Sequence, residues 1–437
     1  MLKKIFILGS VFLLTACHSS LNKMTLLRSP EKLTHAYSYE EVNEQGYFSF
    51  KDKLKEVSSK LSESVIKREF KDNGNITLSP LSIELCLGLA VSASSGTTRE
   101  ELLNIFDMDF VTFNRYYKTY YNQMSLERYG DDNKLMSQQL LTNSIWIDSN
   151  IKLFDKGLDD LMNDYYCYSY QADFRNDNEK SNKAIEEFIS DKTKGLIKPK
   201  LQFSPDTLFV LMNTLYLKDI WNNAGIELTY AEDEYKFTNK DGQVSSKKLL
   251  DPNKYLTGKT LVTDNFSSFY TSTLNGFKIT FIKPNNGKDL KDIFTASNIS
   301  YAINKDNYIY KDDTRMEKYH TKCIFPEYKA ECDVELKDII REDYHVNTLF
   351  DSDSCDFSNL TQLEVFISSI KHIAKLEVNK KGIEGAAVTL MMGEAASIGD
   401  PDPYQHIYEI FPVDQEFGFV ITYQNAVIFS GTVTNID

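Results

Sequence analysis

The feature that most restricts the fold of this chain is a segment of small, mostly uncharged residues that begins at Gly382. In an extended conformation, alternate side chains point to opposite faces. The odd positions carry no charge; they are Ile383, Gly385, Ala387, Thr389, Met391, Gly393 and Ala395. The even positions include Glu384 and Glu394. As a strand, this segment could place one face in a sheet without burying a charge, and keep both carboxylates in water. The alternative is an exposed Gly/Ala-rich loop.

Two other segments are predicted strands. Residues Ile373–Val378 alternate in polarity and lead into Gly382, while Phe209–Trp221 is a long apolar run with a single Asn213. Further upstream, a Ser-Pro step precedes an apolar helix that ends near Val91, and Ser79 or Ser82 could cap that helix.

Composition is typical of a folded protein and excludes one class of function. The chain has 437 residues, 42% of them hydrophobic and 26% charged, with 26 Tyr and 27 Phe that favour a sheet-rich interior. The formal net charge is -14. Nucleic-acid binding is not expected, because phosphate neutralisation needs a basic surface.

The N-terminus predicts export. A basic start, Met1–Lys4, precedes the apolar segment Ile5–Leu14, which is too short to span a bilayer as a mature helix. Leu14-Thr15-Ala16-Cys17 resembles the lipobox of bacterial lipoproteins. The resemblance implies a signal peptide over residues 1–16, a lipid on Cys17 and anchoring in the cell envelope. Residues 17–45 are then a polar tether to a domain over 46–437. The alternative is an ordinary secretion signal that contains a Cys.

Catalytic and metal-binding motifs are not recognisable. No nucleophile elbow, zinc-protease, Walker A or dinucleotide fingerprint is present, so an enzyme is the least favoured class. His320, Cys323, Cys332, His345 and Cys355 do not have zinc-module spacing, so we predict no metal site. Cys323 and Cys332 could form a disulfide, but free thiols are expected.

The motifs fall in an order that resembles the serpin family over roughly residues 50–437. The hinge-like stretch Glu377–Thr389 is similar to the start of the family's reactive-centre loop, although Ile383 stands where a Thr or smaller residue is usual. The other matching segments are Asn75–Ile83, Ser94–Leu102, Ile185–Ile197, Phe209–Trp221, Phe325–Lys329, Asp356–Ser358, Phe411–Phe419 and Val427–Val433. Four further positions depart from the pattern: Glu186, Phe188, Gln415 and Glu416.

The resemblance implies an α+β fold and a function. The expected architecture is one large domain with a dominant central sheet, two further sheets, eight or nine helices and an exposed reactive-centre loop at about 380–403. The expected function is suicide inhibition of a serine protease, with cysteine proteases as a second target class. The inhibitor is expected to be a monomer that forms a covalent acyl complex with the protease and needs no cofactor. The alternatives are a serpin-fold protein that is only cleaved as a substrate, and a surface lipoprotein that binds other ligands.

The resemblance also implies roles for particular residues. At the family's spacing from Gly382 the reactive bond joins Ala396 and Ser397, and the small residues there suit an elastase-like protease; Met391 or Met392 is an alternative bait. The hinge is Gly382, Ile383, Glu384, Gly385, Ala386, Ala387, Val388 and Thr389. A buried polar cluster, the shutter, is expected at Ser79, Ser82, Asn213 and His372. Trp221 is expected at the breach, where the hinge inserts into the sheet.

Overall fold

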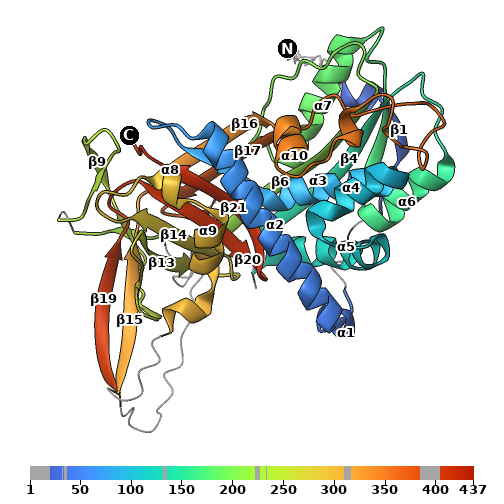
Figure 1. Cartoon of the computed structure of the whole chain (residues 1–437). Helices are drawn as coiled ribbons and strands as arrows, with labels where there is room; N and C mark the ends of the chain where they lie inside the picture. Colours follow the sequence, from blue (N-terminus) through green and yellow to red (C-terminus); the bar gives the residue numbers. More distant parts are fainter. Residues whose placement is uncertain are drawn as a thin grey trace, which may run out of the picture.

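A large mixed sheet runs through the computed structural model of this protein, which describes residues 20–31, 33, 37–130, 135–221, 227–232, 234–309, 316–383 and 404–437 (Figure 1). Eight strands form this central sheet. In spatial order they are β1 (Thr25–Arg28), β5 (Cys167–Ala172), β4 (Leu135–Asp148), β6 (Phe209–Ile220), β18 (Gly382–Ile383), β17 (Lys371–Asn379) and β16 (Tyr328–Glu335), with β3 (Leu126–Tyr129) paired to β4. The predicted strands around Phe209–Trp221 and Ile373–Val378 are confirmed as β6 and β17.

Two hydrophobic layers cover the faces of the central sheet. Odd positions of β6, such as Leu215 and Leu217, contact the main core, whereas Val210 joins a second cluster with Trp146 of β4. Helix α7 (Asn178–Lys192) supplies apolar side chains to this second cluster, among them Phe188. The period of two along β6 therefore sends side chains to both faces, as expected for a strand buried on both sides.

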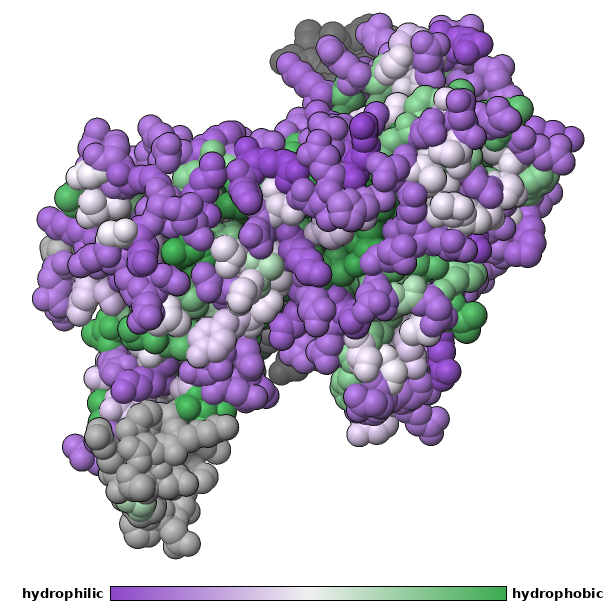
Figure 2. Space-filling model, in the orientation of Figure 1, coloured by the Kyte–Doolittle hydropathy of each residue, from purple (hydrophilic) through white to green (hydrophobic). Residues whose placement is uncertain are grey.

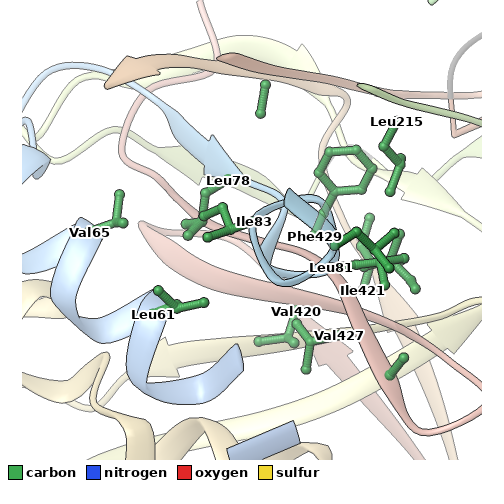
Figure 3. Packing of buried hydrophobic residues seen from close by; sticks show 14 of the residues in the cluster. Leu61, Val65, Leu78, Leu81, Ile83, Leu215, Val420, Ile421, Val427 and Phe429 are labelled. Carbon is green, nitrogen blue, oxygen red and sulfur yellow. The ribbon is translucent and has the colours of Figure 1, made fainter. Parts of the chain in front are cut away.

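Helix α3 (Pro80–Ala93) lies between the central sheet and a second sheet of six strands. The Ser79 hydroxyl accepts a hydrogen bond from the Ser82 amide at 3.2 Å, which confirms the predicted N-cap. Nearly every residue of α3 is buried, and Figure 3 shows side chains from α2, α3 and the second sheet gathered around its first turn. The second sheet contains, in order, β12 (Leu261–Val262), β13 (Phe266–Ser272), β14 (Lys278–Pro284), β20 (Phe417–Tyr423), β21 (Ala426–Val433) and β2 (Ile76–Leu78).

A third sheet holds the chain after residue 403. Strand β19 (Gln405–Pro412) pairs in parallel with β15 (Glu317–Ile324), which pairs with β11 (Leu256–Thr257). The segment 384–403 thus connects the central sheet to the third sheet. Two short pairs complete the strands: β7 (Thr229–Tyr230) with β10 (Leu250–Asp251), and β8 (Lys236–Thr238) with β9 (Val244–Lys248).

The described residues form ten α-helices, of which α1 and α8 are single turns of four residues. Those not yet given are α1 (Tyr39–Val42), α2 (Gln45–Glu69), α4 (Gly96–Phe106), α5 (Phe110–Met124), α6 (Asp155–Tyr165), α8 (Leu290–Ile293), α9 (Ala296–Ile303) and α10 (Lys337–Glu342), with 3-10 turns η1 (Leu21–Lys23), η2 (Lys305–Tyr308) and η3 (Thr348–Phe350). None of the helices within the described ranges is long and apolar enough to cross a bilayer. Figure 2 shows that hydrophilic residues cover most of one face of the molecule.

The region expected to be an irregular tether, residues 17–45, contributes a strand. Residues Thr25–Arg28 form β1, which pairs with β5 at the edge of the central sheet. The Arg28 guanidinium donates to Asp159 at 2.6 Å and to Asp155 at 2.8 Å, both on α6. The strand has only four residues, Thr-Leu-Leu-Arg, which is too short for a period-two pattern to stand out. This part of the predicted tether therefore belongs to the sheet.

Candidate functional site

A two-residue strand, β18, lies between the two long strands β6 and β17. Gly382 and Ile383 pair with Asn379 and Val378 of β17 on one side. On the other side they pair with Ile220 and Asp219 of β6. In the described part of the sheet, β6 and β17 are joined only through β18. The expected exposed loop from about residue 380 thus begins later, because Lys380–Lys381 form a tight turn and the next two residues lie in the sheet.

Glycine is required at position 382. Its φ of +155° is unfavourable for other residues, and a Cβ atom there would collide with the carbonyl oxygen of Asp219. The side chain of Ile383 is 0% exposed and belongs to the main core on the α3 side of the sheet. Although larger than the residue usual at this position, Ile383 is therefore fully accommodated.

The turn before β18 is fixed from three directions. The Trp221 indole N–H donates to the Asn379 carbonyl at 2.7 Å, and the Lys380 amide donates to Glu327 Oε1 at 2.8 Å. The Leu228 amide donates to the Lys380 carbonyl at 2.8 Å. Trp221 is 2% exposed and its ring lies 5.2 Å from that of Phe325. The predicted breach residue therefore lies directly beside the hinge.

A buried carboxylate supports the opposite side of the hinge. Asp219 is 1% exposed and accepts hydrogen bonds from the Asn275 side chain at 2.8 Å and the Ile220 amide at 2.9 Å. Burial raises the pKa of Asp219, and these donors act in the opposite direction. Sequence reasoning missed this residue, although a lone carboxylate in the apolar run Phe209–Trp221 was a usable signal.

Beyond β18 the gap between β6 and β17 contains a small cavity. Its volume is about 60 Å³, and it is lined by residues 210–214 of β6 and 371–373 of β17. Apolar residues near α7 cover it, namely Ile189, Ile197, Leu201 and Phe203. The cavity lies along the path that a longer β18 would follow.

All four predicted shutter residues lie at the N-terminus of α3. The Ser79 amide donates to His372 Nε2 at 3.1 Å, and the Ser82 hydroxyl donates to the Asn213 carbonyl at 3.3 Å. The Asn213 side chain donates to Asn143 Oδ1 at 2.8 Å. Because the Ser82 amide also donates to the Ser79 hydroxyl, the four residues are joined in one chain of hydrogen bonds around one helix end. Sequence reasoning missed Asn143, whose signal was an amide within the mostly apolar stretch that forms the end of β4.

His372 makes the folded state sensitive to acid. Because Nε2 accepts the Ser79 N–H, the ring must be neutral, and burial lowers its pKa to about 4. A lowered folded-state pKa gives stability that is present above about pH 6.5, the usual value of an unfolded His, and lost as the pH falls towards 4. The shift corresponds to ~3 kcal/mol across this window.

We expect His372→Gln to reduce this acid sensitivity, because Gln does not titrate and its side-chain oxygen can accept from Ser79. The measurement is the free energy of unfolding at pH 7 and pH 4.5, with His345→Gln, at an exposed position, as the control. The loss of unfolding free energy between pH 7 and pH 4.5 should be smaller in His372→Gln than in the natural protein and in His345→Gln. An equal loss in all three would show that His372 does not titrate as described.

Several predicted sites lie outside the described residues. They are Glu384, Gly385, Ala386, Ala387, Val388 and Thr389 of the hinge, the reactive bond Ala396–Ser397, and Cys17. The five later cysteines are free, as expected. Among the residues that the structure describes, no three His, Cys, Asp or Glu side chains come together as metal ligands.

Comparisons with known proteins agree on one family. Residues 52–436 match the family model described as "Serpin (serine protease inhibitor)". An uncharacterized serpin-like protein of Methanosarcina acetivorans is 25% identical over 350 residues, 76% of each chain. Human Serpin B4 is 25% identical over 74% of this chain and 85% of its own. Among solved structures, the native state of the thermophilic serpin tengpin has a TM-score of 0.70 at 19% identity and covers 94% of this chain and 100% of its own.

Proposed function

Because the chain belongs to the serpin family, we propose that it inhibits serine proteases, with residues 384–403 as the bait loop. The observation that supports this proposal is the position of β18. Gly382 and Ile383 are already paired on both sides, while β6 and β17 are not paired with each other beyond them. Such a sheet can accept a further strand, and strand addition is a known mode of peptide binding.

The chemistry would be supplied by the protease. Its serine attacks the carbonyl carbon of Ala396, the bond to the Ser397 nitrogen breaks, and the new ester joins the protease to Ala396. The loop then extends β18 and carries the attached protease along the sheet before water reaches the ester. An extended continuation places the odd positions on the same side as Ile383, which is the core side. Those positions are uncharged through Ala395.

The dimensions are compatible with insertion. Strand β6 has 12 residues, which at ~3.3 Å per residue give a path of roughly 40 Å. Residues 383–396 cover a similar length when extended. The protease would therefore move across most of the sheet.

The bait favours a shallow primary pocket. Ala395 and Ala396 are small, so we propose elastase-like targets, with Met391 or Met392 as the alternative bait and cysteine proteases as a second target class.

The test is incubation of the full chain with elastase-like, trypsin-like and chymotrypsin-like serine proteases and a papain-like cysteine protease, followed by denaturing electrophoresis. We expect an SDS-stable adduct with an elastase-like enzyme and a released fragment that begins at Ser397 by mass spectrometry. A protease whose active-site serine is blocked is the control and should give neither product. Complete cleavage without adduct would identify the protein as a substrate and contradict inhibition.

We also propose that the protein is a lipid-anchored envelope protein. The support is the lipobox-like Leu14–Cys17, with a polar segment after it. Fatty-acid labelling in a bacterial host tests this proposal: the natural chain should be labelled and Cys17→Ser should not. Equal labelling of both would exclude Cys17 as the lipid site.

A further inference from the structure

The folded domain holds the chain only a few residues after Cys17. The Leu21 amide donates to Glu187 Oε2 of α7 at 2.9 Å, and Leu21 and Met24 are partly buried against the hydrophobic cluster that contains Phe188. Three residues separate Cys17 from Leu21, so these two residues lie at most about 14 Å apart. A lipid on Cys17 would therefore hold the surface around α7 close to the bilayer.

A basic segment lies beside the same helix. Residues 192–200, at the end of α7 and directly after it, include no acidic residue and four lysines, namely Lys192, Lys194, Lys198 and Lys200. The last three are exposed. Leu196, between them, is partly buried against the same hydrophobic cluster as Leu21. The start of the described chain and this basic segment therefore both pack around α7.

The acidic residues in the second half of α7 do not cancel this charge. Glu186 accepts a hydrogen bond from the Leu201 amide at 2.7 Å, and Glu187 accepts the one from Leu21. Asp191 lies 3.5 Å from Lys192 Nζ and so offsets only that lysine. Because the two glutamates bind backbone amides of neighbouring segments, the exposed charge of residues 192–200 is positive, in a chain whose net charge is -14.

We propose that the surface formed by η1, α7 and residues 192–200 rests on a bilayer that contains anionic lipids, an inference that depends on the proposed lipid anchor at Cys17. Lysines are attracted to an anionic membrane surface, and a basic patch strengthens attachment by a lipid chain. Figure 1 shows β1 and α7 at one end of the molecule and β15 and β19 at the other. The third sheet, which contains the chain after the bait loop, therefore stays clear of the bilayer.

The test is acetylation of the lysines of the lipidated protein, first in vesicles of phosphatidylethanolamine and phosphatidylglycerol and then in detergent. Mass spectrometry gives the rate for each lysine. In vesicles we expect roughly threefold or slower reaction at Lys194, Lys198 and Lys200, because a charged surface shields what lies against it. Lys236 on β8 and Lys288 after β14 are exposed elsewhere and should react equally in both samples.

Two changes test the contribution of charge, both read at Lys183, which is exposed on α7. In the first, phosphatidylcholine replaces phosphatidylglycerol. The second is a triple substitution by Gln at Lys194, Lys198 and Lys200. Each should reduce the protection of Lys183. The matched control, which removes the same charge elsewhere, is a triple substitution by Gln at the exposed residues Lys236, Lys288 and Lys291, and it should leave the protection unchanged.

A second mode of attachment separates this inference from the lipid anchor. In a tagged chain, six histidines replace residues 2–16 and bind vesicles that contain a nickel-chelating lipid, so the chain is held near the same point without a bacterial lipid. Equal acetylation of the α7-side and control lysines in both attached forms would overturn the inference. Protection that neither change reduces would overturn the preference for anionic lipids. Protection in the tagged chain, without fatty-acid labelling of Cys17, would support this surface and refute the anchor.

Discussion

Cleavage within residues 384–403 is expected to raise the melting temperature of this protein by about 10 °C or more. Once cut, the segment after Ile383 can extend β18 between β6 and β17, where the backbone groups of roughly ten residues gain partners on both sides. At ~1 kcal/mol per net hydrogen bond this adds on the order of 10 kcal/mol. For a domain of this size the unfolding entropy converts that energy into roughly 10 °C.

The measurement is thermal unfolding of intact and nicked protein, followed by circular dichroism. The nicked sample is prepared with a protease that cuts the bait loop without forming an adduct, and the site is confirmed by mass spectrometry. Equal melting temperatures would mean that the cut loop stays outside the sheet. The intact fold would then hold no energy that cleavage releases, and the inhibitory proposal would lose its driving force.

Ile383→Arg is expected to convert the protein from an inhibitor into a substrate. Ile383 is 0% exposed between β6 and β17, so Arg would place an unpaired charge in the core or force β18 out of the sheet. Either result delays insertion, and water then releases the protease from its acyl-enzyme. The yield of SDS-stable adduct per loop cleaved should fall at least tenfold, and the gain in melting temperature on nicking should shrink.

Two controls separate the effect of position from the effect of charge. Ile383→Thr keeps an uncharged β-branched residue and should retain most of the adduct yield. Val244→Arg adds the same charge at a residue that is 58% exposed on β9, and it should inhibit like the natural protein. If Ile383→Arg gives as much adduct as Val244→Arg, insertion does not pass through position 383.

Local patterns predicted much of the architecture. The apolar run of β6, the alternation of β17 and the Ser-Pro start of α3 each specify an element from neighbouring residues alone. The similarity to serpins then predicted how these elements are arranged in one fold. It also predicted that four polar residues cluster together, namely Ser79, Ser82, Asn213 and His372. It did not foresee which of them are hydrogen-bonded to one another, because hydrogen-bond partners depend on side-chain positions that no local pattern specifies.

Other features arise only from long-range contacts. Strand β1 is only four residues long. It belongs to the central sheet because it pairs with β5 and because Arg28 forms ion pairs with two carboxylates of α6. Asn143 is an ordinary amide in sequence, and its contact with Asn213 spans 70 residues. Leu21 and the basic segment 192–200 are far apart in sequence, and only the tertiary structure brings them to one helix, α7.

The sequence by itself determined which residues can occupy a strand after Gly382, because charge and size on alternate positions are local properties. It also placed a glycine at position 382, where the fold requires one. Only the tertiary structure decided that Gly382 and Ile383 already lie between β6 and β17. That position depends on how far apart in space the fold holds these two strands, which are about 150 residues apart in sequence. It also depends on the Asp219 carbonyl, which leaves no room for a side chain at position 382. Which strands pair depends on the packing of the whole core, whereas the alternation of polar and apolar residues is a local property of the sequence.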